Sequence, residues 1–400
     1  MSDKVVVRSS SKDTSNFKEL PERRLGVINE APDTIPQGNF AVNSTANFLH
    51  PQVQFLKVKQ VAEIADDTRA YLLEPDTFHG TAKLAYFRPG QSISIKLNIG
   101  NAVVTRAYTI CSSPARSIED EYLIIVKRRK NGFASNYIYN TWKKGTELEC
   151  SAPFGSFHYQ ALRDTKKFIG ICDNEGIAPF LSMAEAICDN TLDANLTLFY
   201  AARKERETIM HERLDELAES SENFRVIYVL SDEHIFKKER GFVTKSMIEK
   251  YAPQKKYSVF LCGSPTLYTM TLPQIADLKL ENKYIRMGMN GQVDNPSSLP
   301  DFPQEAKGLT FTCKVIKNGK EVATIPCSSE ESLLVALERE GIAAPSMCRS
   351  GECGFCRSKL LTGNVFIPQG TDYRRLVDSS YGIIHPCVSY PMSHLTLVIS

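Results

Sequence analysis

The sequence predicts a multidomain protein in which an antiparallel β-barrel is followed by an α/β domain with a parallel sheet and then by an α+β domain. Three observations predict this order: short runs of alternating polarity come first, strand runs then alternate with helix-like segments, and a hairpin with one helix closes the chain. The length of 400 residues fits about two to three domains. A hydrophobic content of 42% is ordinary for a protein with buried cores.

The composition narrows the classes of partner. Lys and Arg number 48 and Asp and Glu number 46, so the net charge of +2 gives no reason to expect binding to nucleic acid or to an anionic membrane surface. No apolar run approaches the ~18 residues of a membrane span, and no signal peptide opens the chain. The 11 cysteines, an odd number, fit a reducing compartment better than a disulfide framework. We therefore expect a cytoplasmic protein, whose oligomeric state the sequence leaves open.

The first two segments of the chain differ in their patterning. Residues 1–50 are polar with little periodicity, and we expect them to form a surface extension, partly disordered, with no chemistry assigned. Residues 51–162 contain regularly spaced short strands with Pro-Gly and Asn-Gly turns, which is typical of an antiparallel barrel. The clearest strand runs are 53–58, 92–97 and 123–127.

Residues 163–291 have the pattern of an α/β domain. Short buried-strand runs alternate with amphipathic helix-like stretches, and this alternation predicts a parallel sheet. Strands are expected at 168–172, 196–200, 226–230 and 258–262, and helices at 180–188 and around 209–217.

A linker and a smaller domain complete the chain. Residues 292–306 are rich in prolines and small polar residues, which predicts a semi-extended linker. Residues 307–400 begin with a hairpin whose turn contains Asn318-Gly319. A helix is expected over 328–340, because Ser328 and Glu331 have the spacing of a capping box.

Four cysteines in this last domain have the spacing of plant-type [2Fe-2S] ligands. Cys348, Cys353 and Cys356 form C-x4-C-x2-C, and Cys387 follows after a long gap. Glycines and small residues between them allow a tight loop to aim backbone N–H groups at the sulfurs. Structural zinc is the main alternative, although its cysteines usually come in two short-spaced pairs. Four unconnected buried cysteines would need a core periodicity that is missing. We therefore predict that these cysteines bind a [2Fe-2S] cluster, and the resemblance of their spacing to that of plant-type ferredoxins implies a β-grasp ferredoxin domain.

Residues 106–114 end a predicted barrel strand with the letters R-A-Y-T-I-C-S-S-P. They resemble the R-x-Y-[ST]-x-x-[ST]-x-P flavin motif of the ferredoxin-NADP reductase family, and the resemblance covers residues 51–290. It implies that Arg106 neutralises the flavin phosphate, that Tyr108 packs against the flavin, and that Thr109 lies near the ring N5. These roles agree with the chemistry of the side chains, since a guanidinium suits phosphate and an aromatic ring can cover one flavin face.

A second flavin element is implied by residues 127–136, K-R-R-K-N-G-F-A-S-N, which resemble the family's G-x-x-S pyrophosphate loop. The A-S-N form resembles the FAD-binding branch more than the FMN-binding reductases, so FAD is the expected flavin. Taken alone, the two motifs also fit a tyrosine in a strand and a basic hairpin tip. The flavin-binding residues that the resemblance implies beyond the first motif are Ile125, Lys127, Gly132, Ala134 and Ser135.

The resemblance also implies a nicotinamide nucleotide site, but the family's G-G-[ST]-G-I-x-P turn is altered here. Asp173 and Glu175 bring two carboxylates into the turn. A carboxylate about 6 Å from a pyrophosphate charge costs roughly 0.7–3 kcal/mol, so we expect binding that is weakened rather than abolished. The expected nucleotide-site residues that keep the family's G-I-x-P and C-G-P-x patterns are Gly176, Pro179, Cys262 and Gly263.

The three parts together predict an NAD(P)H-dependent iron-sulfur flavoprotein oxidoreductase. Their order resembles the reductases of phenylacetyl-CoA and ketosteroid oxygenases and of hybrid cluster protein, which implies FAD, a [2Fe-2S] cluster and NAD(P)H as cofactors. Electrons would pass from NAD(P)H through FAD and the cluster to a partner redox protein, whether an oxygenase, a hybrid-cluster-type protein or another acceptor. No catalytic side chain is expected, because the cofactors carry the chemistry.

Two questions stay open in the sequence. Arg203, Lys204 and Arg206 after the second strand of the α/β domain could favour the 2′-phosphate of NADPH or could form a solvated face. Asp173 and Glu175 are also compatible with an electron-relay subunit of a larger redox complex, in which the nucleotide pocket is degenerate. A redox sensor is a third hypothesis, but it lacks an output domain.

Overall fold

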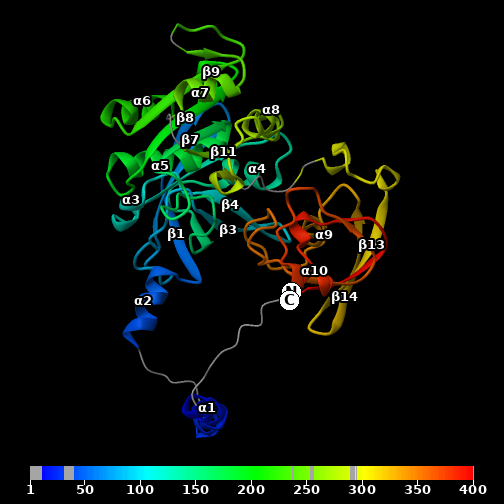
Figure 1. Cartoon of the computed structure of the whole chain (residues 1–400). Helices are drawn as coiled ribbons and strands as arrows, with labels where there is room; N and C mark the ends of the chain where they lie inside the picture. The colour runs from blue at the N-terminus through cyan, green and yellow to red at the C-terminus, as the bar shows by residue number, and fades with distance from the viewer. Residues whose placement is uncertain are drawn as a thin grey trace, which may run out of the picture. The chain divides into compact units, whose positions relative to one another are not determined.

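The structure is a computed structural model of the whole chain, and it describes residues 11–30, 40–236, 238–252, 256–288, 293 and 295–399 (Figure 1). The chain divides into two compact units, Met1–Ala46 and Asn47–Ser400. Among the described residues, no helix has both the length and the apolar character that crossing a membrane requires.

The described parts of the first 50 residues are helical, which the low periodicity of this segment did not predict. α1 spans Ser11–Glu30 with Pro21 inside it, and α2 spans Ala41–Leu49. Glu, Leu and Arg are strong helix formers and surround Pro21, which explains why helix persists although proline removes one backbone hydrogen bond.

The flavin-domain prediction of an antiparallel barrel is confirmed. Six strands follow the order β4-β3-β6-β1-β2-β5, and all neighbouring pairs are antiparallel. A bridge between Ile110 and Ile124 joins the end of β4 to β5 and closes the sheet. The elements are β1 (Val53–Ala65), β2 (Thr68–Pro75), β3 (Ser92–Ile99), β4 (Ala102–Thr109), α3 (Pro114–Ile118), β5 (Tyr122–Lys127), α4 (Phe133–Thr141) and β6 (Glu147–Ser151).

The α/β domain has the predicted parallel sheet. Its strand order is β10-β9-β8-β7-β11-β12, and all neighbouring pairs are parallel. From β7 the chain adds β8 and β9 on one side and later adds β11 and β12 on the other. The elements are β7 (Lys167–Asp173), α5 (Ile177–Cys188), β8 (Asn195–Ala202), α6 (His211–Ser220), β9 (Phe224–Leu230), β10 (Glu239–Arg240), α7 (Lys245–Tyr251), β11 (Ser258–Cys262), α8 (Pro265–Ala276) and β12 (Ile285–Met287).

Helices cover both faces of this sheet, with α5 and α6 on one face and α7 and α8 on the other (Figure 1). α5 also packs against the barrel, which explains why it is buried along almost its whole length. The backbone N–H of Ser113 donates to Glu185 Oε2 at 3.0 Å, and Ser182 Oγ donates to the carbonyl of Ser112 at 2.7 Å. These bonds connect the end of the flavin motif to the nucleotide domain.

The C-terminal domain is the predicted α+β fold, in which a mixed sheet packs against a helix. Its strand order is β14-β13-β19-β15-β17; β13 and β19 are parallel and the other neighbours antiparallel. A small sheet pairs β16 with β18. The elements are β13 (Thr310–Lys317), β14 (Lys320–Ser328), α9 (Leu333–Arg339), β15 (Ser358–Thr362), β16 (Val365–Phe366), α10 (Leu376–Ser380), β17 (Ile383–Ile384), β18 (Tyr390–Pro391) and β19 (Leu395–Ile399).

Two local predictions for this domain have different outcomes. The hairpin turn is confirmed, because Asn318 and Gly319 both have positive φ, 52° and 74°, as a type I′ turn requires. The helix prediction is wrong at its start. α9 begins at Leu333 with Ser332 as its N-cap, because β14 continues pairing through Ser328.

The linker also differs from the semi-extended segment expected. Residues 296–298 and 304–306 form short 3₁₀ turns, and Phe302 between them is buried. Its ring meets Phe366 edge-on with centroids 5.3 Å apart. The linker therefore packs onto the C-terminal domain through an apolar anchor that composition alone did not reveal.

Candidate functional site

The four predicted cluster cysteines come together in the C-terminal domain. Three lie on the loop between α9 and β15, and Cys387 lies in the 3₁₀ turn Pro386–Val388. Cys356 Sγ and Cys387 Sγ are 3.5 Å apart, close to the separation of about 3.8 Å between two sulfurs bound at about 2.3 Å to one tetrahedral metal. Cys353 is exposed whereas the other three cysteines are buried, so the cysteine cluster reaches the protein surface at Cys353.

The loop around these cysteines aims backbone N–H groups at sulfur. The N–H groups of Ser350 and Cys353 donate to Cys348 Sγ at 3.5 and 3.4 Å, and the N–H of Phe355 donates to Cys353 Sγ at 3.4 Å. Positive φ at Gly351, 82°, makes this path possible. The buried hydroxyl of Ser350 has no hydrogen-bond partner among the described residues. Four thiols and several donors fit an anionic iron-sulfur cluster.

The first flavin motif lies on β4. Arg106 is mostly buried, and its Nη1 donates to the carbonyl of Thr105 at 2.7 Å. Burial, with the nearby charge of Arg349, lowers the pKa of Arg106 to about 10. Burial likewise raises the pKa of Tyr108. Thr109 Oγ1 lies 3.2 Å from Ser92 Oγ, at the end of the strand.

The second flavin element lies between β5 and α4. Ile125 is buried in β5, and Lys127 ends that strand. Gly132 is the N-cap of α4 and has no side chain to cap the helix, so the first-turn N–H groups are available to an anion. Ala134 and Ser135 belong to that first turn, and Ser135 Oγ accepts the N–H of Arg129 at 3.2 Å. These residues and Arg106 suit the phosphates of FAD.

The expected nucleotide residues gather at the carboxyl ends of β7 and β11, where the strand order reverses. Ligands of open α/β sheets bind at such a switch point. A Cβ on Gly176 would collide with the carbonyl oxygen of Cys262 and lie 2.7 Å from the Cα of Gly263. Pro179 lies in the first turn of α5, which follows the 3₁₀ turn Asn174–Gly176.

Both carboxylates of the altered turn have partners. Asp173 accepts the backbone N–H of Ser264 at 2.7 Å and the Ser264 hydroxyl at 2.5 Å, at the start of α8. Burial raises the pKa of Asp173 despite these bonds. Glu175 lies 3.6 Å from the guanidinium of Arg129. The carboxylates are therefore turned toward α8 and toward the flavin barrel, respectively.

Two of these partners were not singled out from the sequence. Arg129 was part of the quoted basic loop, but its pairing with Glu175 is a contact between two domains. Lys127 Nζ also donates to Asn174 Oδ1 at 3.2 Å, so the flavin loop holds the nucleotide turn at two points. Ser264 directly follows Cys262 and Gly263 in the sequence. A serine before a proline is a common start of a helix, and this was the signal that could have identified Ser264 as the N-cap of α8.

Comparison with protein-family models agrees with this geometry. Residues 55–159 match an oxidoreductase FAD-binding domain, residues 171–272 an oxidoreductase NAD-binding domain, and residues 315–392 a 2Fe-2S iron-sulfur cluster binding domain. The chain is an iron-sulfur flavoprotein oxidoreductase. The predicted cofactors FAD, NAD(P)H and a [2Fe-2S] cluster are thereby confirmed, whereas the individual site residues and domain boundaries stay predictions.

Several relatives of this oxidoreductase are reductase components of oxygenase systems. The glycine betaine monooxygenase reductase subunit of Chromohalobacter salexigens is 27% identical over 78% of this chain and 88% of its own length. The ferredoxin reductase component of 3-ketosteroid-9-alpha-monooxygenase from Mycobacterium tuberculosis is 26% identical over 84% of this chain and 93% of its own. Phthalate dioxygenase reductase has a similar fold, with a TM-score of 0.62 and 24% identity over 87% of this chain and 98% of that chain.

Two alternatives were open for the basic residues after β8, a site for the 2′-phosphate of NADPH and a solvated face. Arg203 Nη2 lies 3.0 Å from Glu207, and Arg206 is exposed. Lys204 is half-buried at the end of the loop after β8. These contacts are compatible with both alternatives.

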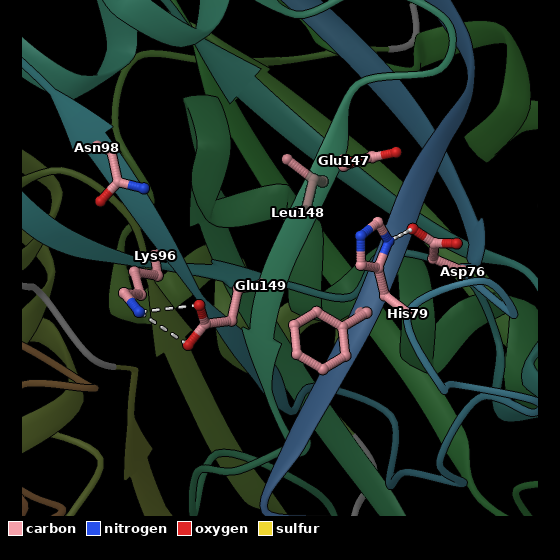
Figure 2. Close-up of a pocket in the computed structure, with 8 residues that line it drawn as sticks. Asp76, His79, Lys96, Asn98, Glu147, Leu148 and Glu149 are labelled. Carbon is pink, nitrogen blue, oxygen red and sulfur yellow. Dashed lines mark hydrogen bonds and ion pairs between the residues drawn. The ribbon is translucent and has the colours of Figure 1, made fainter.

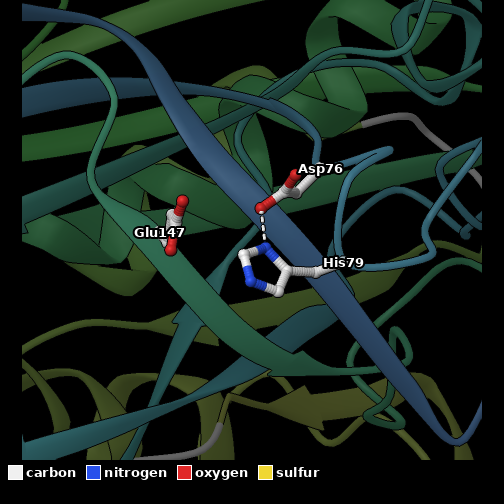
Figure 3. Close-up of side chains that lie close together, drawn as sticks. All are labelled: Asp76, His79 and Glu147. Carbon is white, nitrogen blue, oxygen red and sulfur yellow. Dashed lines mark hydrogen bonds and ion pairs between the residues drawn. The ribbon is translucent and has the colours of Figure 1, made fainter.

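A separate polar cluster lies on the barrel of the oxidoreductase, in a pocket of about 240 Å³ (Figure 2). Asp76, His79 and Glu147 approach one another there, and Asp76 Oδ2 lies 2.5 Å from His79 Nδ1 (Figure 3). Lys57 Nζ is 2.9 Å from Asp76 and 3.8 Å from Glu147, so an ammonium already occupies the space between these carboxylates and offsets part of their charge. The cluster is an ion-pair network at the protein surface around the buried Asp76, and it does not suit a metal ion.

Proposed function

We propose that the protein is an electron-transfer reductase that passes electrons from NAD(P)H through FAD and a [2Fe-2S] cluster to a partner redox protein. One observation carries the proposal: the cluster loop contacts the flavin strand directly. Thr105 Oγ1, next to Arg106, lies 2.6 Å from Ser346 Oγ, which is two residues before Cys348. The strand that carries the flavin motif and the loop that carries three of the cluster cysteines are therefore in direct contact.

The residues have separate roles in this proposal. Arg106 and the first turn of α4 bind the flavin phosphates, while Tyr108 and Thr109 position the ring. Cys348, Cys353, Cys356 and Cys387 hold the cluster, and the N–H groups at their sulfurs stabilise its negative charge. When bound, FAD supplies hydride and single-electron chemistry and the cluster carries one electron at a time.

The partner is proposed to be an oxygenase component. The support comes from the reductase subunits to which the chain is similar, which are named for glycine betaine and 3-ketosteroid monooxygenases. A hybrid-cluster-type protein or another electron acceptor is the alternative partner. The cytoplasm stays the compartment predicted from the sequence.

Reconstituted protein tests the proposal by anaerobic stopped-flow absorbance. NADH or NADPH should bleach the flavin first, and the cluster absorbance should fall afterwards. A flavin that stays oxidised with both nucleotides at millimolar concentration, although dithionite reduces it, would contradict nucleotide-driven reduction.

An electron-relay subunit is the second candidate, and Asp173 favours it. Its carboxylate uses the Ser264 N–H at the start of α8, and a Cβ on Gly263 would collide with its Oδ1. Part of the crevice is thus filled by the chain itself. A relay would accept electrons from a partner protein and show no flavin reduction by either nucleotide.

A further inference from the structure

The ferredoxin domain contacts the flavin barrel through residues that neighbour the cluster cysteines. Ser346 precedes Cys348 by two positions and meets Thr105 of β4 at 2.6 Å. Glu352 directly precedes Cys353, and its carboxylate accepts a hydrogen bond from Ser156 at 3.3 Å. Helix α9 itself lies beside β4. The cluster loop is therefore part of the interface between the two domains.

Glu338 lies at the centre of this interface. Its Oε1 is 2.5 Å from Nη1 of Arg349, the residue after Cys348, and its Oε2 is 3.9 Å from Nη1 of Arg106. The side chains of Glu338 and Arg349 are only 6% and 7% exposed. The Glu338 carboxylate thus lies between two arginines. Arg106 is assigned to the flavin phosphate, and Arg349 directly follows the cluster ligand Cys348 in the chain.

The two contacts of Glu338 with Arg349 and Arg106 differ in kind. The contact with Arg349 is a charge-assisted hydrogen bond within the ferredoxin domain and holds the Glu338 carboxylate in place. The contact with Arg106 is an ion pair across the interface at 3.9 Å, and salt screens it little because Glu338 is buried. Undocking the ferredoxin domain would separate Glu338 from Arg106. The docked arrangement is favoured accordingly.

We propose that Glu338 is a positioning residue that docks the cluster loop on the flavin arginine and so sets the rate of electron transfer between flavin and cluster. The inference rests on the proposed function and extends it to a residue outside the cofactor motifs. Glu338 binds neither cofactor. It acts through Arg106 on the barrel side and through Arg349 on the cluster side.

The test replaces Glu338 with glutamine and measures the single step between the cofactors. Light-driven reduction of the bound flavin, with EDTA as the electron donor, starts the reaction without any nucleotide. We expect Glu338→Gln to slow cluster reduction by about tenfold or more, since small misplacements of reacting groups have effects of this size. Flavin content, iron content and the EPR spectrum of the cluster should stay unchanged.

Glu340→Gln is the matched control, because Glu340 is exposed two residues further along and pairs with Arg339 on the surface. It should transfer electrons at the wild-type rate. Glu338→Asp keeps the charge but withdraws it by one methylene, and it should also slow the transfer even if the glutamine variant folds poorly. Transfer within twofold of wild type in a folded Glu338→Gln or Glu338→Asp protein would overturn the proposal.

The light-driven start separates this inference from the proposed function. If neither nucleotide reduces the wild-type flavin, the reductase hypothesis fails while the transfer step remains measurable. If the nucleotides reduce the flavin but Glu338→Gln leaves the transfer step unchanged, only the role of Glu338 is refuted.

Discussion

The Glu175 carboxylate lies 3.6 Å from the Arg129 guanidinium, so the acidic turn of the nucleotide domain is paired with the pyrophosphate loop of the flavin barrel. Lys127 strengthens the same connection through Asn174. The pairing changes the expected electrostatics, because a carboxylate beside a guanidinium repels a phosphate less than an isolated one does. The turn and the loop therefore have to be considered as one charged unit.

Replacing Glu175 with glutamine should strengthen nucleotide binding. The change removes one negative charge from the turn, and we expect the KM for NADH or NADPH to fall about threefold, the effect of one charge at about 6 Å in water-like surroundings. The kcat should change little, because the charge acts equally on ground and transition states. Steady-state reduction of ferricyanide measures both constants. Glu249→Gln, which removes a surface partner of Lys245, is the control, and a raised KM in Glu175→Gln would contradict the expectation.

Cys387→Ala should abolish the cluster, because the remote cysteine supplies one of the four expected ligands. Iron and acid-labile sulfide should fall to background, and the reduced protein should lose its EPR signal. Cys313→Ala is the control, since Cys313 is equally buried but lies on β13 in the core of the same domain. A full EPR signal in the Cys387 variant would refute the ligand assignment.

Arg106→Ala should weaken FAD binding, because loss of one partner of a buried, hydrogen-bonded charge pair costs about 2–5 kcal/mol. Arg106→Lys should recover only part of the affinity, since an ammonium lacks the bidentate geometry of a guanidinium. Titration of the apoprotein with FAD, followed by flavin fluorescence, gives the dissociation constants. Arg88→Ala, an exposed change on the same barrel, should leave them unaltered.

Arg286→Met should destabilise the protein at the junction before the nucleotide domain. Arg286 Nη2 lies 2.6 Å from Asp164, whose side chain is fully buried. The cost should be about 3 kcal/mol, the lower end for a broken buried pair, because Arg163 remains 3.4 Å from the same carboxylate. Urea denaturation measures it. Lys283→Met, which breaks an exposed pair with Glu281, should leave the curve unchanged, and coincident curves for both variants would contradict the prediction.

The ion pairs of Asp76 should make the free energy of unfolding depend on pH in the acid range. Burial alone would raise the pKa of Asp76, but hydrogen bonds from His79 and Lys57, with their charges, lower it to about 2. The folded pKa lies below the unfolded value of about 3.9, so the stabilisation is complete above about pH 4 and is lost as the pH falls toward 2. Wild type should therefore exceed Asp76→Asn in stability at pH 6, with the difference shrinking by pH 3.

Urea denaturation at several pH values between 6 and 3 measures the effect of the Asp76 change. Asp66→Asn, an exposed change on the same barrel, serves as the control and should show no pH-dependent difference. A constant difference between wild type and Asp76→Asn across this range would mean that the pKa of Asp76 is not lowered by folding.

The sequence by itself determined the order of domains, most strands and the cofactor motifs. The run 258–262 coincides with β11. Asn318-Gly319 correctly marks the turn of the hairpin between β13 and β14. These features depend on hydrophobic periodicity and turn chemistry, which act over a few neighbouring residues. The cysteine spacing is equally local for the three ligands of the loop. The start of α9 was missed because pairing of β14 with β13 competed with a plausible capping box.

Only the tertiary structure decided which polar side chains contact each other across the chain. Thr105 and Ser346 are 241 positions apart, yet their hydroxyls lie within hydrogen-bond distance. Arg106 meets Glu338, Arg129 meets Glu175, and Asp173 meets Ser264 in the same way, across elements or domains that no local pattern connects. The physical reason is that these pairs form when folded surfaces dock. Their partners are set by the packing of whole domains, whereas helix propensity, strand alternation and ligand spacing are properties of short segments.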